Sequence, residues 1–463
     1  MQSLGNFIPN NRIHKIHFIG IGGAGMSGIA EVLHHNGFKV SGSDMQESTQ
    51  TKYLQNLGIK IFTGHKAENI ADAEIVVYSS AVQAGNAEIV FASEKGIPVI
   101  RRAEMLGELM RLKYTLAVAG THGKSSTTSL LGSIFEMAAE DPTVIVGGIV
   151  QGKGSGTTVG KGFYLIAESD EFDRSFLQMM PSTALITNID SDHLDTYRDL
   201  DDIKNAFVEF ANKVPFYGQV VLCIDDDGCQ SVLSRLTKPV VTYGFSPQAA
   251  YSVKNCRYSE HGSEFEVLCR GKSLGEFSIR LLGKHNVQNA VGALALATEE
   301  SISVEISKKA LAEFAGVKRR MELKGSVKGA LVFDDYAHHP TEVAASLSAF
   351  RESFPKRRII AVFQPHLYSR TRDLAEEFGT VFGNSDIILV CDIYGAREKP
   401  LEGVSGNLVF EFAKARGHRN AHFIEAKENA IGFLENEIKD GDLIVTMGAG
   451  NITSLSAKIL EIV

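Results

Sequence analysis

The segment VAGTHGKSSTTSLLGSIF (118–135) places an apolar run directly before a glycine-rich turn and a helical pattern. A buried strand, a glycine turn and a helix in that order form the repeating unit of parallel α/β folds. The same order starts near Lys15 and again near Met321. We therefore predict an α/β protein of three domains, which span residues 1–113, 114–321 and 322–463.

The loop GTHGKSS (120–126) has the composition of a phosphate-binding loop. Glycines let backbone N–H groups turn toward an anion, and the N-terminus of the following helix adds partial positive charge. We expect Lys124 to reach the terminal phosphates of a nucleotide and Ser125 to place its hydroxyl on Mg²⁺. Position 118 is Val where the standard G-x-x-x-x-G-K-[ST] loop has Gly, so an ordinary strand-to-helix turn with a surface lysine remains an alternative.

Two polar residues, Glu168 and His193, lie at the carboxyl ends of predicted strands of the same region, YLIAES (164–169) and TALITNI (183–189). Parallel sheets expose their ligand sites at the carboxyl ends of the strands. We expect both side chains to lie near Ser125 and to complete the coordination of a hard cation. Each taken alone is more often a solvated acid or a loop histidine, but the phosphate loop favours the metal site.

A second glycine-rich turn, GIGGAG (20–25), separates the strand KIHFI (15–19) from the helical pattern MSGIAEVLHHNG (26–37). With Asp44 after the next strand, it matches the dinucleotide-binding fingerprint. The pattern requires a diphosphate at a helix N-terminus, which NAD, FAD or a UDP-sugar would each supply. An NAD-dependent oxidoreductase therefore stays open at this point.

Composition excludes several classes of function. The chain is 44% hydrophobic and 22% charged with a mean hydropathy of -0.01, as in ordinary globular proteins. No apolar run is long enough to span a bilayer, and MQSLGNFIPNNRIH (1–14) lacks the features of a secretory signal, so we expect a cytoplasmic protein. A net charge of -8 argues against binding to nucleic acid or membranes, and five scattered cysteines indicate reduced thiols.

Ten segments in collinear order make the chain resemble the Mur ligase family of peptidoglycan synthesis. They are HFIGIGGAGMSGIAEVL (17–33), SGSD (41–44), GTHGKSSTTS (120–129), ESDEFDRSFL (168–177), TNIDSDHLDTY (187–197), GKHNVQNA (283–290), VKRRME (317–322), DDYAHHPTE (334–342), FQPHLYSRT (363–371) and GAGN (448–451).

The resemblance implies an N-terminal Rossmann-like domain for the UDP moiety, a central P-loop ATPase-like domain with a mixed sheet, and a C-terminal Rossmann-like domain. It is closest to the family members that join L-alanine to the lactyl carboxylate of UDP-N-acetylmuramate. In these enzymes ATP phosphorylates the carboxylate, and the amine of L-alanine attacks the acyl phosphate. ATP and Mg²⁺, with Mn²⁺ as a substitute, are the implied cofactors, and a monomer or homodimer is the implied assembly.

The resemblance also implies a role for individual residues. Lys124, Glu168 and His193 would be catalytic, and Ser125, Glu168 and His193 would hold metal. Tyr336, His338, His366 and Arg370 would line the amino-acid pocket. The residues implied to bind ATP are Gly120, Thr121, His122, Gly123, Lys124, Ser125, Ser126, His285, Asn286, Asn289, Arg320 and Asp335. Those implied to bind the UDP-sugar are Gly20, Gly22, Gly23, Gly25, Met26, Ser27, Asp44, Ser79 and Ser80.

Two alternatives remain beside the L-alanine ligase. The murein peptide ligases of cell-wall recycling have similar glycines and a similar acidic motif, but FQPHLYSRT (363–371) favours L-alanine as the substrate. Position 208 is Val where ligases acting later in the pathway carry a carbamoylated lysine, which also favours the first ligase. An oxidoreductase would not need the loop GTHGKSS (120–126). One departure from the family is Leu367, where related L-alanine ligases commonly have arginine.

Overall fold

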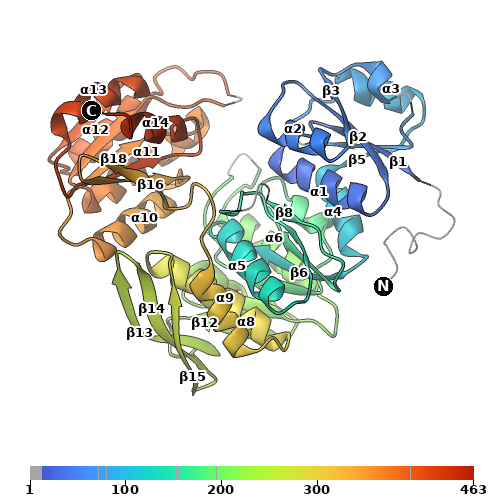
Figure 1. Cartoon of the computed structure of the whole chain (residues 1–463), viewed down its shortest axis with the longest axis horizontal. Helices are drawn as coiled ribbons and strands as arrows, with labels where there is room; N and C mark the ends of the chain where they lie inside the picture. Colours follow the sequence, from blue (N-terminus) through green and yellow to red (C-terminus); the bar gives the residue numbers. More distant parts are fainter. Residues whose placement is uncertain are drawn as a thin grey trace. The chain divides into compact units, whose positions relative to one another are not determined.

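The computed structural model describes residues 13–70, 72–79, 81–152, 156–193, 196–396 and 398–462, and these form three sheets (Figure 1). By packing, the chain divides into two compact units. Unit 1 comprises Met1–Lys254, Glu266–Phe277 and Gln288–Phe314, and unit 2 comprises Asn255–Phe265, Ser278–Val287 and Ala315–Val463.

The N-terminal sheet has the strand order β3-β2-β1-β4-β5, and all its pairs are parallel. The strand order reverses between β1 and β4, and open parallel sheets bind nucleotides outside the carboxyl ends of the strands at such a point. Its elements are β1 (Lys15–Ile19), α1 (Ala24–His35), β2 (Lys39–Asp44), α2 (Thr49–Asn56), β3 (Lys60–Thr63), η2 (Ala67–Ile70), β4 (Ile75–Tyr78), α3 (Ala87–Glu94), β5 (Val99–Arg101) and α4 (Arg102–Met110).

The central sheet has ten strands in the order β15-β14-β13-β12-β11-β10-β6-β9-β7-β8. Its strands are β6 (Tyr114–Ala119), β7 (Thr143–Ile145), β8 (Thr157–Thr158), β9 (Tyr164–Glu168), β10 (Thr183–Ile186), β11 (Val220–Cys223), β12 (Val240–Gly244), β13 (Tyr251–Ser259), β14 (Gly262–Cys269) and β15 (Lys272–Ile279). Its helices are α5 (Lys124–Met137), η3 (Ser175–Gln178), α6 (Leu200–Asn212), α7 (Asp227–Val232), η4 (Leu233–Arg235), α8 (Lys284–Glu299) and α9 (Val304–Glu313).

The central sheet is mixed, as expected from the sequence. Strands β6, β9, β10, β11 and β12 pair in parallel, whereas β7 and β8 pair antiparallel. The neighbours β14 and β15 are joined only by Arg270 and Gly271, which have φ values of 47° and 82°. A two-residue turn with both φ values positive reverses the chain, so β14 and β15 run antiparallel.

The C-terminal sheet has the strand order β16-β17-β21-β18-β19-β20, with only β16 antiparallel among these pairs. Apolar side chains alternate between its two faces and pack into two separate clusters. The elements are β16 (Glu322–Val327), β17 (Ala330–Asp335), α10 (Pro340–Ser353), β18 (Ile359–Phe363), α11 (Tyr368–Val381), η5 (Phe382–Asn384), β19 (Ile387–Cys391), α12 (Gly406–Ala415), β20 (Ala421–Ile424), η6 (Lys427–Asn429), α13 (Ala430–Glu437), β21 (Leu443–Met447) and α14 (Thr453–Ile459).

All five cysteines are free thiols. Cys223, Cys229 and Cys391 are buried, and Cys256 and Cys269 are half-buried. Burial raises the pKa of Cys223 and of Cys391 to about 12, so both thiols stay protonated at neutral pH. Within the described residues, no helix combines the length and the apolar character that crossing a bilayer requires.

Candidate active site

The loop from β6 to α5 turns on two glycines that have no room for a side chain. Gly120 has a φ of 137°, and a Cβ atom there would lie 1.9 Å from Thr187 Oγ1. Gly123 has a φ of 81°, and its Cβ would lie 2.6 Å from Asn289 Oδ1 on α8. Both positions therefore combine a left-handed backbone with close neighbours, which only glycine tolerates.

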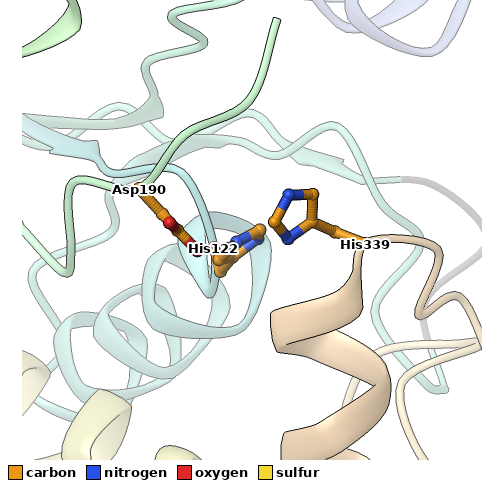
Figure 2. A group of neighbouring side chains, drawn as sticks. All are labelled: His122, Asp190 and His339. Atoms are coloured by element: carbon orange, nitrogen blue, oxygen red, sulfur yellow. Dashed lines mark hydrogen bonds and ion pairs between the residues drawn. The ribbon is translucent and has the colours of Figure 1, made fainter. Parts of the chain in front are cut away.

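The segment after β10 holds this loop in place. Asn188 accepts a hydrogen bond from the His122 N–H at 2.8 Å and donates one to the His122 carbonyl at 3.0 Å. The Asp190 N–H donates to Thr121 Oγ1 at 2.9 Å. Figure 2 shows the His122 ring beside Asp190, with Nε2 3.3 Å from Oδ2. Thr121 and His122 thus take part in positioning the loop backbone.

His339 is also drawn in Figure 2, but it belongs to unit 2. Its side chain caps α10, where Nδ1 accepts a hydrogen bond from the Thr341 N–H at 3.4 Å.

Lys124 opens α5 and is held by acceptors of its own loop and by a buried acid. Its Nζ donates to the carbonyls of Gly120 and Thr121 at 2.7 and 3.1 Å and to Glu171 Oε2 at 2.7 Å. Burial of the amine favours its neutral form, but Glu171 and then Asp170 outweigh this effect and keep the pKa of Lys124 above its ordinary value. Lys124 is therefore charged when it meets an anion.

Ser125 and Glu168 lie together, where β9 ends beside the first turn of α5. The Ser125 hydroxyl donates to Glu168 Oε1 at 2.9 Å, and the Gly147 N–H donates to Glu168 Oε2 at 2.6 Å. A hydroxyl and a carboxylate are oxygen ligands of the kind that Mg²⁺ binds. Ser126 is buried in the same turn of α5.

His193 lies beside Glu171, an acid to which the sequence assigned no role. His193 has a φ of 56°, its Nε2 is 3.6 Å from Glu171 Oε1, and its ring meets Phe172 edge to face. Glu171 is 1% exposed, and its Oε1 atom has no hydrogen-bond partner within the described part of the chain. Burial raises the pKa of Glu171 to about 7, although Lys124 opposes the shift.

The residues at the end of the central sheet fit a divalent cation. The neighbouring oxygens of Ser125 and Glu168 are ligands of the kind that such a cation binds. So is Glu171 Oε1, which is buried, has no hydrogen-bond partner among the described residues and lies 3.6 Å from His193 Nε2. The signal for Glu171 was present in the motif ESDEFDRSFL (168–177), but that motif holds three acids besides Glu168, which left the choice open.

The glycine-rich turn after β1 is held by the end of β2. The N–H groups of Gly20 and Ile21 donate to the Ser43 carbonyl at 2.8 and 3.1 Å, and the Gly22 N–H donates to Asp44 Oδ2 at 2.9 Å. Asp44 therefore shapes the loop through its carboxylate.

The other predicted UDP-sugar residues surround this turn. A Cβ atom on Gly20 would lie 3.4 Å from Ser79 Cβ, and one on Gly25 would lie 2.8 Å from an Arg102 nitrogen. Gly23 is the N-cap of α1, and Met26 is buried in the helix with Ser27 half-buried next to it. Ser80 lies outside the described residues.

In unit 2, Tyr336 follows β17, and two arginine side chains pack against its ring. The guanidinium carbons of Arg319 and Arg320 lie 4.9 and 5.0 Å from the ring centroid. Arg320 and His338 share one acid, because Glu342 lies 3.3 Å from Arg320 Nη1 and 3.2 Å from His338 Nδ1. Glu342 was not singled out from the sequence, although it ends the motif DDYAHHPTE (334–342).

The predicted amino-acid residues form one chain of contacts. The rings of His338 and His366 meet edge to face with centroids 5.8 Å apart, and Tyr336 packs against His338 in the same way at 5.2 Å. Arg370 Nη1 lies 3.4 Å from His366 Nδ1. Leu367, the N-cap of α11, has a φ of 70°, which is uncommon for a residue with a side chain.

The remaining predicted ATP residues are divided between the units, with Asn289 in unit 1 and His285, Asn286, Arg320 and Asp335 in unit 2. Asn286 donates to the Leu282 carbonyl at 2.9 Å. Burial lowers the pKa of His285 to about 4, and Arg320 adds to the shift.

Asp335 is 3% exposed and accepts hydrogen bonds from Ser346 Oγ at 2.5 Å and the Ala337 N–H at 3.1 Å. Burial raises its pKa to about 6.

Family models match most of the chain. Residues 15–114 match "Mur ligase family, catalytic domain", residues 118–297 match "Mur ligase middle domain", and residues 319–450 match "Mur ligase, glutamate ligase domain". The chain belongs to the Mur ligase family. Membership confirms the predicted family, the three-domain α/β fold and the class of ATP-dependent ligase, and it removes the oxidoreductase alternative.

Individual Mur ligases are similar over nearly the whole chain. The UDP-N-acetylmuramate–L-alanine ligase of Desulfotalea psychrophila is 49% identical over 451 residues, which cover 97% of this chain and 98% of that protein. The ligase of the same name from Myxococcus xanthus is 46% identical over 448 residues, which cover 97% and 95%.

Solved structures of Mur ligases share the fold. The crystal structure of the UDP-N-acetylmuramate–alanine ligase MurC of Thermotoga maritima has a TM-score of 0.81 at 30% identity, covering 96% of this chain and 98% of that one. The murein peptide ligase of Psychrobacter arcticus has a TM-score of 0.71 at 24% identity, covering 96% and 98%, and this likeness concerns the fold alone.

Proposed function

We propose that this Mur ligase joins L-alanine to the lactyl carboxylate of UDP-N-acetylmuramate with hydrolysis of ATP, in the synthesis of peptidoglycan precursors. The observation that carries the proposal is the pair of anion-binding turns in unit 1. One, after β1, suits the diphosphate of a UDP-sugar, and the other, after β6, suits the phosphates of ATP. The names of relatives 46% and 49% identical over 97% of the chain support the substrates.

Lys124, Ser125 and Glu168 carry the first half of the reaction. The γ-phosphoryl group moves to a lactyl carboxylate oxygen, ADP leaves, and the Lys124 ammonium stabilises the charge that develops on the transferred oxygens. Ser125, Glu168 and His193 are the proposed ligands of Mg²⁺, for which Mn²⁺ is a substitute, and the bound metal would neutralise phosphate charge. Gly120 to Ser126, Asn286 and Asn289, with His285, Arg320 and Asp335, remain the proposed ATP contacts.

The residues after β17 and β18 carry the second half. The neutral amine nitrogen of L-alanine attacks the acyl carbon, phosphate leaves, and the amine proton passes to solvent. Arg370 beside His366 is the proposed partner of the α-carboxylate, because a guanidinium binds a carboxylate in a bidentate manner. Tyr336 and His338 complete the proposed pocket wall. The requirement for ATP supports a cytoplasmic location, and either a monomer or a homodimer would suffice.

One experiment tests the proposal. The protein is incubated with UDP-N-acetylmuramate, ATP and Mg²⁺ and with each amino acid in turn, and the products are identified by mass. We expect the L-alanyl product and phosphate release that depends on both L-alanine and the sugar nucleotide. A product formed with the murein tripeptide but not with L-alanine would contradict the proposal, as would turnover that needs no sugar nucleotide.

A further inference from the structure

A small cavity in unit 1 lies between α1, α2 and the backbone that follows β7. Its volume is about 30 Å³, which is enough to admit a water molecule or a small group of a ligand. A polar group of a bound ligand could therefore enter it. Its lining includes Ser27, Glu31, Gln50, Tyr53 and Gly147.

Glu31 is the acid of this cavity, one helical turn beyond Ser27 on α1. It is 6% exposed, and its Oε1 atom accepts a hydrogen bond from the Tyr53 hydroxyl at 2.7 Å. This carboxyl is part of the cavity lining. An ionised carboxylate offers about four acceptor positions, so Glu31 can accept a further hydrogen bond from a ligand in the cavity. Burial also raises the pKa of Glu31.

The lining of the cavity includes residues close to each of the two anion-binding turns. Ser27 belongs to the first turn of α1, which directly follows the glycine-rich loop. Gly147, another lining residue, donates its N–H to Glu168, which also accepts from Ser125. The sugar of a ligand with its diphosphate at α1 and its reacting carboxylate near Glu168 would therefore lie near residues of this lining.

We propose that Glu31, held in place by Tyr53, is a specificity-determining residue that accepts a hydrogen bond from an N–H or O–H group of the sugar in the sugar nucleotide. This inference rests on the proposed function, because it takes the sugar nucleotide as the substrate. A purely structural role, in which the Glu31–Tyr53 pair only ties α1 to α2, makes a different prediction. It would change stability without separating the sugar from the uridine diphosphate.

The test compares UDP with UDP-N-acetylmuramate by isothermal titration calorimetry. In Glu31→Leu, which keeps volume but removes the acceptor, we expect UDP-N-acetylmuramate to bind at least about tenfold more weakly, while the Kd for UDP changes less than about twofold. Glu31→Gln keeps a carbonyl acceptor and should restore binding to within about threefold of the parent. The KM for ATP should stay unchanged in both variants.

Tyr251→Phe is the matched control, because Tyr251 donates to Glu299 at 2.8 Å in a second tyrosine–glutamate pair of unit 1, outside the cavity. It should leave both Kd values unchanged. A parent protein that does not bind UDP-N-acetylmuramate would overturn the proposed function. Binding in the parent, with Glu31→Leu either unchanged or weakened equally toward UDP, would overturn this inference alone.

Discussion

At the scale of single residues, the ion pair of Lys124 and Glu171 is expected to contribute both to the rate of the reaction and to the stability of the fold. Lys124→Met removes the charge at the phosphates, so we expect kcat to fall at least about 100-fold. The same change leaves Glu171 buried without its cation, and we expect the free energy of unfolding to drop by about 3 kcal/mol. Steady-state kinetics and urea denaturation measure the two effects.

The control for Lys124 is the double variant Lys124→Met, Glu171→Gln. It should regain most of the lost stability because no buried charge remains, but its activity should stay low. Activity in Lys124→Met within tenfold of the parent would contradict the assignment of this loop to the γ-phosphate.

Arg370 is expected to set the affinity for L-alanine. Arg370→Lys replaces a planar guanidinium, which can make two parallel hydrogen bonds to a carboxylate, by a compact ammonium group. We therefore expect the KM for L-alanine to rise at least about tenfold, which corresponds to a loss of roughly 1.4 kcal/mol of binding free energy. The KM values for ATP and the sugar nucleotide should barely change. Arg372→Lys is the matched control, because Arg372 pairs with Asp373 at 2.7 Å and is expected to leave the KM for L-alanine unaltered. An unchanged KM in Arg370→Lys would move the role to Arg372 or His366.

Asp335 makes stability depend on pH. Its pKa is about 6 in the folded protein against an ordinary 3.8, so between pH 4 and 6 the folded state keeps a proton that the unfolded state releases. Stability therefore falls as pH rises through this window, by roughly 2–3 kcal/mol in total. In Asp335→Asn the side chain does not titrate, so this fall in stability with rising pH should be absent. We expect its urea midpoint to match the parent near pH 4 and to exceed it above pH 6, and parallel pH profiles would refute the role.

At the scale of elements, the turn between β1 and α1 is sensitive to any added side chain. A Cβ atom on Gly22 would lie 2.9 Å from both Asp44 Oδ2 and Thr51 Cγ2. Gly22→Val should therefore displace the loop and raise the KM for the sugar nucleotide steeply, with little change for ATP. Gly85→Val is the control, because nothing lies within 4 Å of its Cβ. Equal weakening of both nucleotides in Gly22→Val would indicate misfolding or a different ligand.

Elements with local signals could be predicted from the sequence. The predicted strand KIHFI (15–19) coincides with β1, and α5 begins at Lys124, because apolar runs and glycine turns act over a few neighbouring residues. The partners Glu171 and Glu342 could not be chosen in advance. Their roles depend on which acid of a cluster the backbone turns inward, and that is decided by distant strands. The positive φ of Leu367 has no local signal either.

At the scale of the whole molecule, the sequence begins the order of strand, glycine turn and helix three times, but the chain packs into two compact units. The first two sheets contribute to one core cluster that contains Met26 and Leu106 together with Met179. Their contact is close, since a Cβ atom on Gly107 would lie 2.5 Å from the Gln178 carbonyl. Such packing joins segments far apart in the chain, so periodicity does not predict it. We keep the boundaries near 113 and 321 as a proposal for the domains.

The buried thiols allow the opening of each unit to be measured separately by chemical labelling. Cys223 and Cys229 lie in unit 1 and Cys391 lies in unit 2, so alkylation by iodoacetamide at any of them requires that unit to open. UDP should bind only to closed unit 1. We therefore expect saturating UDP to slow the labelling of Cys223 and Cys229, read by peptide mass, and to leave the rate at Cys391 unchanged. Equal slowing at all three cysteines would mean that the two units open as one.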